Sequence, residues 1–228
     1  MTEPHRARFS VDERRAQLLE LGLRLFAERA YDEVSIDDIA SAANISKGLL
    51  YHYYGGKRAF YVACVAHAAE ALVERTHMSD EIPEPDRARA GLDAYFDYAE
   101  EHATAYVALM RSGIGNDPEV AAIVEATRTR IVRRALDGMG ITTPRPAFRA
   151  ALRAWIGAVE AACLEHLEHR DVARVGLVDM LLAGLYGLLV VAKQLDPDAP
   201  FALGPPPQPP TQTETASPPS RGSRRRQP

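Results

Sequence analysis

Apolar side chains recur at three- and four-residue spacings through almost the whole chain, and this periodicity limits what the chain can fold into. Alternation with the two-residue period of a β-strand is almost absent, and β-branched residues are scattered. The pattern therefore predicts an all-α fold. The expected helices cover residues 11–28, a two-turn segment after Ser35, and residues 47–53, 57–77, 86–101, 103–112, 118–138, 146–168 and 171–194.

The composition is 46% hydrophobic and 25% charged over 228 residues, which predicts a globular protein with a buried core and excludes a wholly disordered chain. The first 15 residues contain arginines and no apolar run, so we expect a cytoplasmic protein without a secretion signal. The most apolar stretch, residues 175–192, is interrupted by Asp179 and is short for a membrane span, so no membrane partner is expected. Cys64 and Cys163 form no CxxC motif, which predicts two free buried thiols.

The net charge is −4, and the acidic excess lies in the middle of the chain rather than at its ends. This balance does not exclude nucleic-acid binding, because phosphates respond to the local charge within a Debye length of about 10 Å. Lys47 and Lys57, two of the three lysines, lie close together in one short segment. That segment is the candidate for a small basic surface.

Residues 35–57 have the layout of a helix-turn-helix. Ser35 stands three residues before Asp38, as in a capping box, and Asn44 tolerates the left-handed conformation of a tight turn. Ser46 can cap the second helix, which would expose only backbone and one cation near its start, as an approach to the major groove requires. The same apolar spacing would also suit a purely structural helical hairpin, so both interpretations stay open at this point.

One run of this chain, LRLFAERAYDEVSIDDIASAANISKGLLYHYYGGKRAFY, carries a family likeness. It resembles the amino-terminal domain of TetR-type bacterial transcriptional regulators. The family signature S-K-G-x-L-Y-x-x-F-x-x-K is matched except that Tyr54 stands at the phenylalanine position, and the likeness covers about residues 14–65. Ala30 and Asn44 stand where the family often has glycine. A positive φ would cost Ala30 more than Asn44.

The resemblance implies a DNA-binding surface on this segment. Residues that would hold phosphates are Ser35, Ser46, Tyr51 and Lys57, and residues that would approach base edges are Lys47, Gly48 and His52, with Tyr53 next to them. Each position also has an ordinary structural alternative. Tyr51 could be a core aromatic, whereas Lys57 and His52 could be solvated surface side chains.

The resemblance also implies a division into a helix-turn-helix DNA-binding domain over 1–56 and an effector-binding and dimerisation domain over 57–196. Clustered prolines and a terminal arginine run predict a disordered tail over 197–228. The last two helices would pair with those of a second subunit, giving a homodimer. The candidate interface residues are Ala154, Ala158, Ala161, Val178, Leu182, Leu185 and Leu189. Packing of the same residues within one subunit is the alternative.

A small-molecule effector would bind among aromatic, flexible and polar side chains of the second domain. The candidate effector-binding residues are Tyr98, His102, Tyr106, Met110, Trp155, Glu160 and Asp179. For each aromatic residue the alternative is plain core packing. Glu160 and Asp179 interrupt apolar helical surfaces, so either could anchor a ligand or hold an arginine.

Neither metal chemistry nor catalysis is expected. Cys163, His166 and His169 follow each other at three-residue spacings, but the helix break near Arg170 spoils a shared face, so we expect no metal or other cofactor. The motifs G-x-S-x-G, G-x-x-x-x-G-K-[ST] and H-E-x-x-H are absent from the sequence, which argues against an enzyme.

These features together predict a homodimeric, ligand-responsive regulator that binds a palindromic DNA operator. The first expectation is a repressor that a small apolar or aromatic effector releases from the operator. An activator of the same architecture is one alternative. A helical small-molecule-binding dimer without specific DNA binding is the other.

Overall fold

The computed structural model describes residues 11–78, 82, 84–111, 117–138, 141–199, 203–204 and 206. Within these residues the chain forms nine α-helices and one 3-10 turn, and none of them is in a β-strand. The elements are α1 (Val11–Glu28), η1 (Tyr31–Glu33), α2 (Ile36–Ala42), α3 (Lys47–Tyr54), α4 (Lys57–Arg75), α5 (Glu84–Glu101), α6 (Ala103–Arg111), α7 (Pro118–Gly138), α8 (Pro146–His169) and α9 (Arg174–Leu195). The predicted all-α fold is confirmed.

The helix bounds follow the sequence expectations closely, with the largest difference at the start of α9. This helix begins at Arg174 rather than near residue 171, because the chain first leaves α8 through Arg170 in the left-handed conformation, with φ of 53°. The break near Arg170 was expected, but its length was underestimated. Most of the predicted tail, 197–228, lies outside the described residues.

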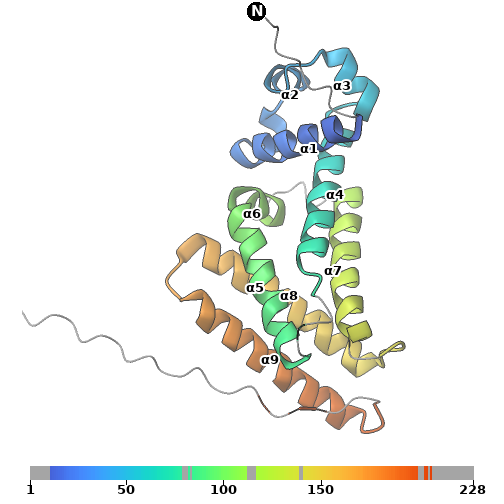
Figure 1. Ribbon diagram of the computed structural model, residues 1–228, viewed down its shortest axis with the longest axis vertical. Coiled ribbons are helices and arrows are strands. Elements are labelled where there is room, and N and C mark those ends of the chain that lie inside the picture. The colour runs from blue at the N-terminus through green and yellow to red at the C-terminus, as the bar shows by residue number, and fades with distance from the viewer. Residues whose placement is uncertain are drawn as a thin grey trace, which may run out of the picture.

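The helices are arranged along one long axis (Figure 1). We call α1–α3 the head and α5–α9 the body. Helix α4 begins under the head and runs into the body, where it packs against α7, while α8 and α9 pair at the far end. Helix α4 therefore touches both parts of the molecule, and α1 of the head also packs against α6 of the body.

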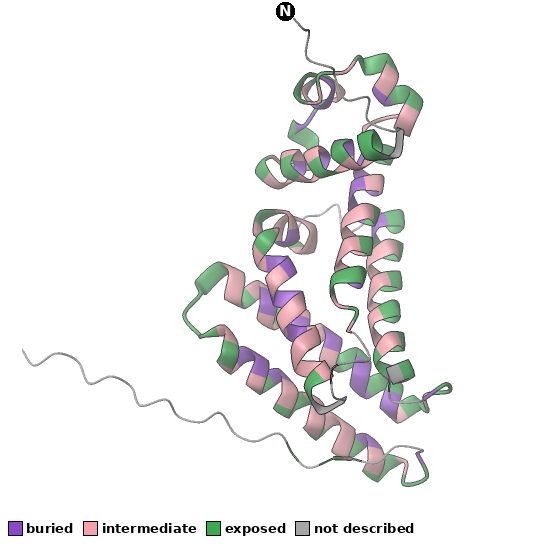
Figure 2. Cartoon of the chain, viewed as in Figure 1, coloured by how far each residue is buried: buried purple, intermediate pink, exposed green. Residues whose placement is uncertain are grey.

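The apolar core is divided into three clusters, and buried positions follow the inward faces of the helices (Figure 2). The first cluster joins Ile39 and Leu50 of the head with Phe60 of α4, and Val120 at the start of α7 completes it. All four side chains are fully buried. The core of the head thus continues into the body.

The packing of α1 on α4 is unusually close at Gly22. A Cβ atom at this position would lie 2.5 Å from the Cys64 Sγ atom and 2.6 Å from a ring carbon of Phe60. Real side chains do not tolerate such distances, so only glycine allows this approach of the two helices. The glycine is a packing requirement rather than a turn.

Ion pairs connect α4 and α7 along their exposed side. At the start of both helices the Arg58 guanidinium donates to both carboxylate oxygens of Asp117, at 2.7 and 2.8 Å. More than three turns further along both helices, at about 3.6 residues per turn, Arg130 donates to Glu70 at 2.9 Å. The bidentate geometry at Arg58 fixes the start of α4 relative to the start of α7.

Candidate DNA-binding surface and effector cavity

The capping box expected at the start of α2 is present. The backbone N–H of Asp38 donates to the Ser35 hydroxyl oxygen at 3.1 Å, and the Asp38 carboxylate accepts from the Ser35 N–H at 2.8 Å and from its hydroxyl at 2.6 Å. These bonds from Ser35, with help from Arg29, lower the pKa of Asp38 to about 2. The Ser35 hydroxyl, a predicted phosphate contact, thus already donates and accepts within the helix cap.

The turn before α3 also forms as expected. Asn44 has a φ of 52°, the left-handed value that its short polar side chain tolerates. The Ser46 hydroxyl caps α3 by accepting from the Leu49 N–H at 3.2 Å, and fully buried Leu50 holds the helix on the core. Ala30 has a φ of −55°, so its turn needs no left-handed residue and the expected cost does not arise.

The outward face of α3 carries most of the predicted DNA-binding side chains. Lys47, Gly48, Tyr51 and His52 are all exposed, as is the capping residue Ser46. Tyr51 is 52% exposed, which contradicts the alternative of a core aromatic. A Cβ atom on Gly48 would meet only the Ser46 hydroxyl, at 3.9 Å, so nothing in the protein itself requires glycine there.

The cation on this face has a partner on the neighbouring helix. Lys47 forms an ion pair with Asp37 of α2, and both side chains are well exposed. An exposed pair of this kind is worth little in water, so the lysine can exchange the carboxylate for a phosphate or a base edge at small cost. The surface is thus open to a polyanion.

Lys57 and Tyr53 lie deeper than the rest of the predicted set. The Lys57 ammonium donates to the backbone carbonyl of Tyr31 at 3.0 Å and stands 4.2 Å from the centre of the Tyr31 ring. Tyr53 is half-buried, with the Arg15 guanidinium 6.0 Å from its ring centre. Both residues support the head structurally, and their contacts with DNA remain predictions.

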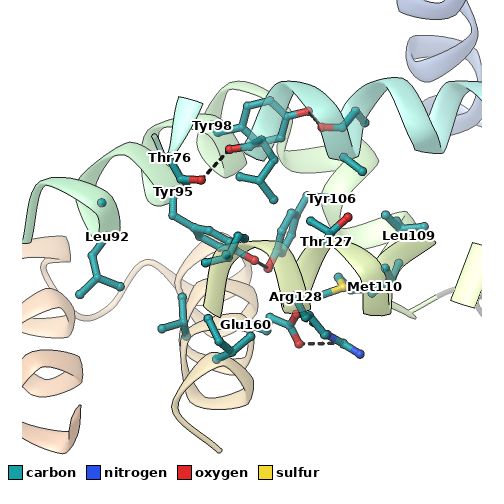
Figure 3. Close-up of a pocket in the computed structure, with 18 of the residues that line it drawn as sticks. Thr76, Leu92, Tyr95, Tyr98, Tyr106, Leu109, Met110, Thr127, Arg128 and Glu160 are labelled. Carbon is teal, nitrogen blue, oxygen red and sulfur yellow. Dashed lines mark hydrogen bonds and ion pairs between the residues drawn. The ribbon is translucent and has the colours of Figure 1, made fainter. Parts of the chain in front are cut away.

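The body encloses a cavity of about 710 Å³, a size that suits a small organic ligand. Helices α1 and α4–α9 all contribute to its lining (Figure 3). Six of the seven predicted effector residues lie on it: Tyr98, His102, Tyr106, Met110, Trp155 and Glu160.

Asp179 is the exception. It lies outside the lining, where it is mostly buried and forms an ion pair with Arg89 of α5. Of the two expectations for this carboxylate, the structure supports the arginine partner and not the ligand contact. The sequence could not separate them because Arg89 is 90 residues away along the chain.

Two pairs of polar side chains meet inside the cavity (Figure 3). The hydroxyl groups of Tyr95 and Tyr106 are hydrogen-bonded at 2.8 Å, and burial raises the pKa of both. Arg128 donates to the two carboxylate oxygens of Glu160 at 2.7 and 2.8 Å. Arg128 was missing from the predicted set, although its position on the apolar stripe between Val124 and Ile131 could have indicated it.

The polar atoms of two further predicted lining residues, Tyr98 and Trp155, bond to the protein backbone. The Tyr98 hydroxyl donates to the carbonyl of Ala68 at 2.8 Å, and burial raises the pKa of Tyr98 to about 12. The Trp155 indole N–H donates to the carbonyl of Leu181 at 2.9 Å. Both rings therefore present apolar surface to the cavity.

The predicted dimer residues are divided between outward and inward faces. Ala154, Ala158 and Ala161 of α8 are exposed, as an interface requires. On α9, however, Val178 is fully buried in the subunit's own core, and Leu182, Leu185 and Leu189 are partly buried against it. The prediction for Val178 is wrong, because the residue has no surface left for a partner.

A different face of α9 is open to a second subunit. Val175, Met180 and Val191 are 64%, 57% and 52% exposed. By length and composition α9 could also cross a membrane, with 22% of its most apolar window buried. It is instead tied to α5 by ion pairs, through Arg89 to Asp179 and through Arg174 to Asp97 at 2.5 Å.

The residues considered for a metal site do not gather. Among the described residues, groups of three or more His, Cys, Asp or Glu side chains placed to hold a metal ion are absent. The His166 Nε2–H donates to the Glu100 carboxylate at 2.8 Å, while Cys163 and Cys64 are buried free thiols. Burial raises the pKa of the Cys163 thiol to about 12, so it stays protonated.

Comparison with known proteins agrees with the geometry of both parts. Residues 18–64 match the family described as bacterial regulatory proteins, tetR family, and residues 85–187 match the tetracyclin repressor-like C-terminal domain. A tetR-family transcriptional regulator from Streptomyces coelicolor is 34% identical, with a TM-score of 0.74 over 83% of this chain and 86% of that chain. The chain belongs to the TetR family. It is a DNA-binding transcriptional regulator and not an enzyme.

Some TetR-type relatives are named as activators and others as repressors of transcription. The transcriptional activator FasR of Mycolicibacterium smegmatis is 29% identical over 147 residues, which span 64% of this chain and 67% of FasR. The transcriptional repressor KstR2 of Mycobacterium tuberculosis is 45% identical over 47 residues, which span 21% of this chain and 24% of KstR2. Both activators and repressors thus occur among its relatives.

Proposed function

We propose that this TetR-family regulator is a cytoplasmic, homodimeric repressor that binds a palindromic operator and leaves it when an apolar or aromatic effector fills the body cavity. Each subunit would place α3 in a major groove, with Lys47, Gly48 and His52 near base edges. Tyr51, Ser46, Ser35 and Lys57 would hold the flanking phosphates. The two recognition helices would have to match half-sites about 34–36 Å apart.

The observation that carries this proposal is the double role of α4. Its first turns bury Phe60 in the core of the head, and its inward face from Tyr61 to Thr76 lines the cavity. A ligand that shifts α4 must therefore also shift the head, because packed cores move as units rather than bend. This link supports release of DNA by an effector.

The outward faces of α8 and α9 support the homodimer. Small residues on α8, among them Ala154 and Ala158, would admit the exposed Val175, Met180 and Val191 of α9 in a four-helix arrangement. Such exposed apolar surface on a folded chain marks an interaction site. A second copy of the chain, related by a two-fold axis, would cover it and mirror a palindromic operator.

Selection of DNA from a random library at near-physiological salt tests the proposal. We expect an enriched palindrome, and we expect Lys47→Ala to weaken its binding by about 1–3 kcal/mol. Arg149→Ala, which removes an exposed cation from α8, is the matched control and should bind as the parent does. Absence of enrichment from a folded dimer would instead favour a small-molecule-binding dimer without specific DNA binding.

The sign of regulation needs its own test. FasR is named as an activator, and this observation makes activation the second candidate. Transcription in vitro from a promoter that contains the selected operator distinguishes the two. A repressor lowers the transcript level and restores it with effector, whereas an activator raises it.

A further inference from the structure

The polar groups inside the cavity limit the chemistry of its ligand. We propose that the cavity takes an elongated, uncharged, mainly apolar molecule whose carbonyl oxygen accepts a hydrogen bond from the Tyr95–Tyr106 hydroxyl pair. This inference deepens the proposed function and rests on it only in treating the cavity as the effector site. The class it names is that of neutral esters, ketones and amides with a long hydrocarbon part.

The shape of the cavity sets the shape of the ligand. Its lining on α4 extends from Tyr61 to Thr76, which corresponds to roughly 22 Å at about 1.5 Å per helical residue. The lining begins at Phe26 under the head and reaches Leu189 near the end of α9. A ligand that fills the cavity along this length would have to be elongated, and the volume of about 710 Å³ has room for a hydrocarbon chain.

Among the hydroxyl groups of the lining, the hydrogen-bond partners single out the tyrosine pair. The hydroxyls of Tyr98, Thr76 and Thr127 each donate to a backbone carbonyl, at 2.8 to 2.9 Å. Tyr95 and Tyr106 contribute two O–H groups but share one hydrogen bond at 2.8 Å, so the second O–H points elsewhere. Figure 3 shows the two rings reaching toward each other from α5 and α6.

The second hydroxyl proton has only a weak acceptor in the protein. The Tyr106 hydroxyl lies within hydrogen-bond reach of the Cys163 thiol, which is buried beside it. Sulfur of a thiol is a poor acceptor, whereas a carbonyl oxygen is a strong one. A ligand carbonyl would therefore take this proton without leaving a strong protein acceptor unpaired.

The charged pair next to the tyrosines argues for a neutral ligand. Arg128 donates two hydrogen bonds to Glu160 and a third to Glu125, the last at 3.3 Å. The guanidinium charge is thus already neutralised, and a ligand carboxylate placed here would lie close to the carboxylate of Glu160. Burying such an unpaired charge is costly, while a neutral carbonyl avoids the cost.

The remaining arginines of the lining are also engaged by the protein. Arg87 donates to the carbonyl of Ile82 at 2.8 Å, and Arg134 donates to the carbonyl of Val73 and to Glu74 at 3.2 Å. Both lie at the end of the cavity formed by the last turn of α4, away from the tyrosine pair. Neither cation offers an unshared charge to an anionic head group.

The test compares three probes of one chain length: methyl decanoate, decanoate at pH 8 and n-decane. Dissociation constants are measured by thermal-shift titration of the full chain, without DNA. We expect methyl decanoate to bind at least about tenfold more tightly than decanoate. The Tyr95→Phe/Tyr106→Phe variant should lose at least about fivefold for the ester and little for decane, a ratio that reflects one lost hydrogen bond.

Controls separate this outcome from a folding defect. Tyr186→Phe removes a hydroxyl from α9 outside the lining and should keep the preference for the ester. The single variant Tyr106→Phe and circular dichroism of every variant show whether the fold persists. Equal binding of decanoate, an unchanged ester affinity in the double variant, or no binding of the ester would each overturn the inference.

The same probes separate this inference from the proposed function. Ester binding that depends on the tyrosine pair but leaves operator affinity unchanged supports the inference and contradicts effector release. Release of the operator by decanoate but not by the ester supports effector release and contradicts the inference about the ligand. Direct binding and operator binding are measured in separate experiments for this reason.

Discussion

Gly48 and Gly22 both lie within helices, but their surroundings are opposite. A methyl group on Gly48 would find open space, so Gly48→Ala should stabilise the protein by about 0.5–1 kcal/mol through helix propensity. The same methyl group would stand between α3 and a DNA groove. We therefore expect a higher melting temperature together with weaker operator binding, measured on the same preparation.

Gly22→Ala is the matched comparison. Its methyl group would meet Cys64 and Phe60, so we expect a loss of about 1–3 kcal/mol in the free energy of unfolding. Operator affinity of the molecules that remain folded should not change. If Gly48→Ala binds the operator as the parent does, α3 does not approach DNA at this residue.

The capping box gives a prediction about pH. Folding lowers the pKa of Asp38 from 3.8 to about 2, so the folded state binds this proton less readily than the unfolded state. The stabilisation is complete above about pH 5 and is lost as the pH falls toward 2. Asp38→Asn should thus destabilise the protein at pH 7 and much less at pH 2, as measured by urea unfolding.

Titration of the Asp38 carboxyl carbon by NMR checks the cause. In Ser35→Ala the hydroxyl donor is gone while the backbone N–H remains. The pKa of Asp38 should then rise part of the way toward its usual value. An unchanged pKa would mean that the Ser35 hydroxyl is not what lowers it.

Residues that act through near neighbours could be predicted from the sequence, and residues that act through distant ones could not. The cap at Ser35 and the turn at Asn44 depend on partners within a few positions, so local spacing revealed them. The partners of Asp179 and Glu160 lie 90 and 32 residues away. Their arginines could only be found once the helices were packed.

At the scale of elements, helix ends were predictable because glycine, proline and asparagine mark them in the sequence. The faces of α9 were not, because this helix is apolar on nearly every side and its periodicity indicates no direction. The choice of Val178 for the dimer followed from that ambiguity. In α8, by contrast, small residues gather on one face, and the alanines predicted for the dimer interface are exposed, while their contact with a second subunit stays a prediction.

The ion pair between Arg58 of α4 and Asp117 at the start of α7 gives a prediction about how ligand binding affects operator binding. Arg58 and Asp117 join the first turns of the two helices, and α7 lines the cavity from Val124 to Asp137. Because the Arg58 side chain is 54% exposed, Arg58→Ala should leave the fold intact and change operator affinity by no more than about twofold without ligand. The loss of operator affinity caused by a releasing ligand should become smaller.

Fluorescence anisotropy of labelled operator, with and without that ligand, measures this difference. Arg75→Ala removes an exposed pair with Glu101 at the other end of α4, at 2.6 Å, and should keep the full response. If the ligand weakens operator binding of Arg58→Ala as much as that of the parent, the coupling between cavity and head runs through the buried contacts of α4 alone.

At the scale of the whole molecule, the exposed face of α9 predicts how the dimer can be broken. Met180 is 57% exposed, so Met180→Glu should leave the subunit folded but place a charge in the interface. We expect sedimentation equilibrium to show monomers, and operator affinity to fall because one reading helix is left. A stable dimer of Met180→Glu would move the interface to another face.

Val178→Ala is the contrasting change on the same helix. Its side chain is fully buried within the subunit, so truncation should cost about 2 kcal/mol of folding free energy. The folded fraction should remain dimeric. The two variants together separate the inward face of α9 from the outward one.

The first core cluster crosses from the head into the body through Phe60 and Val120. A fragment that stops at residue 56 would lack both side chains and so lose part of the core that contains Ile39 and Leu50. Heating should therefore melt the two parts in one calorimetric transition instead of two. A ligand in the cavity then also protects α2 and α3, which contribute nothing to its lining, so ligand binding should raise the resistance of the DNA-binding helices to heat and proteolysis.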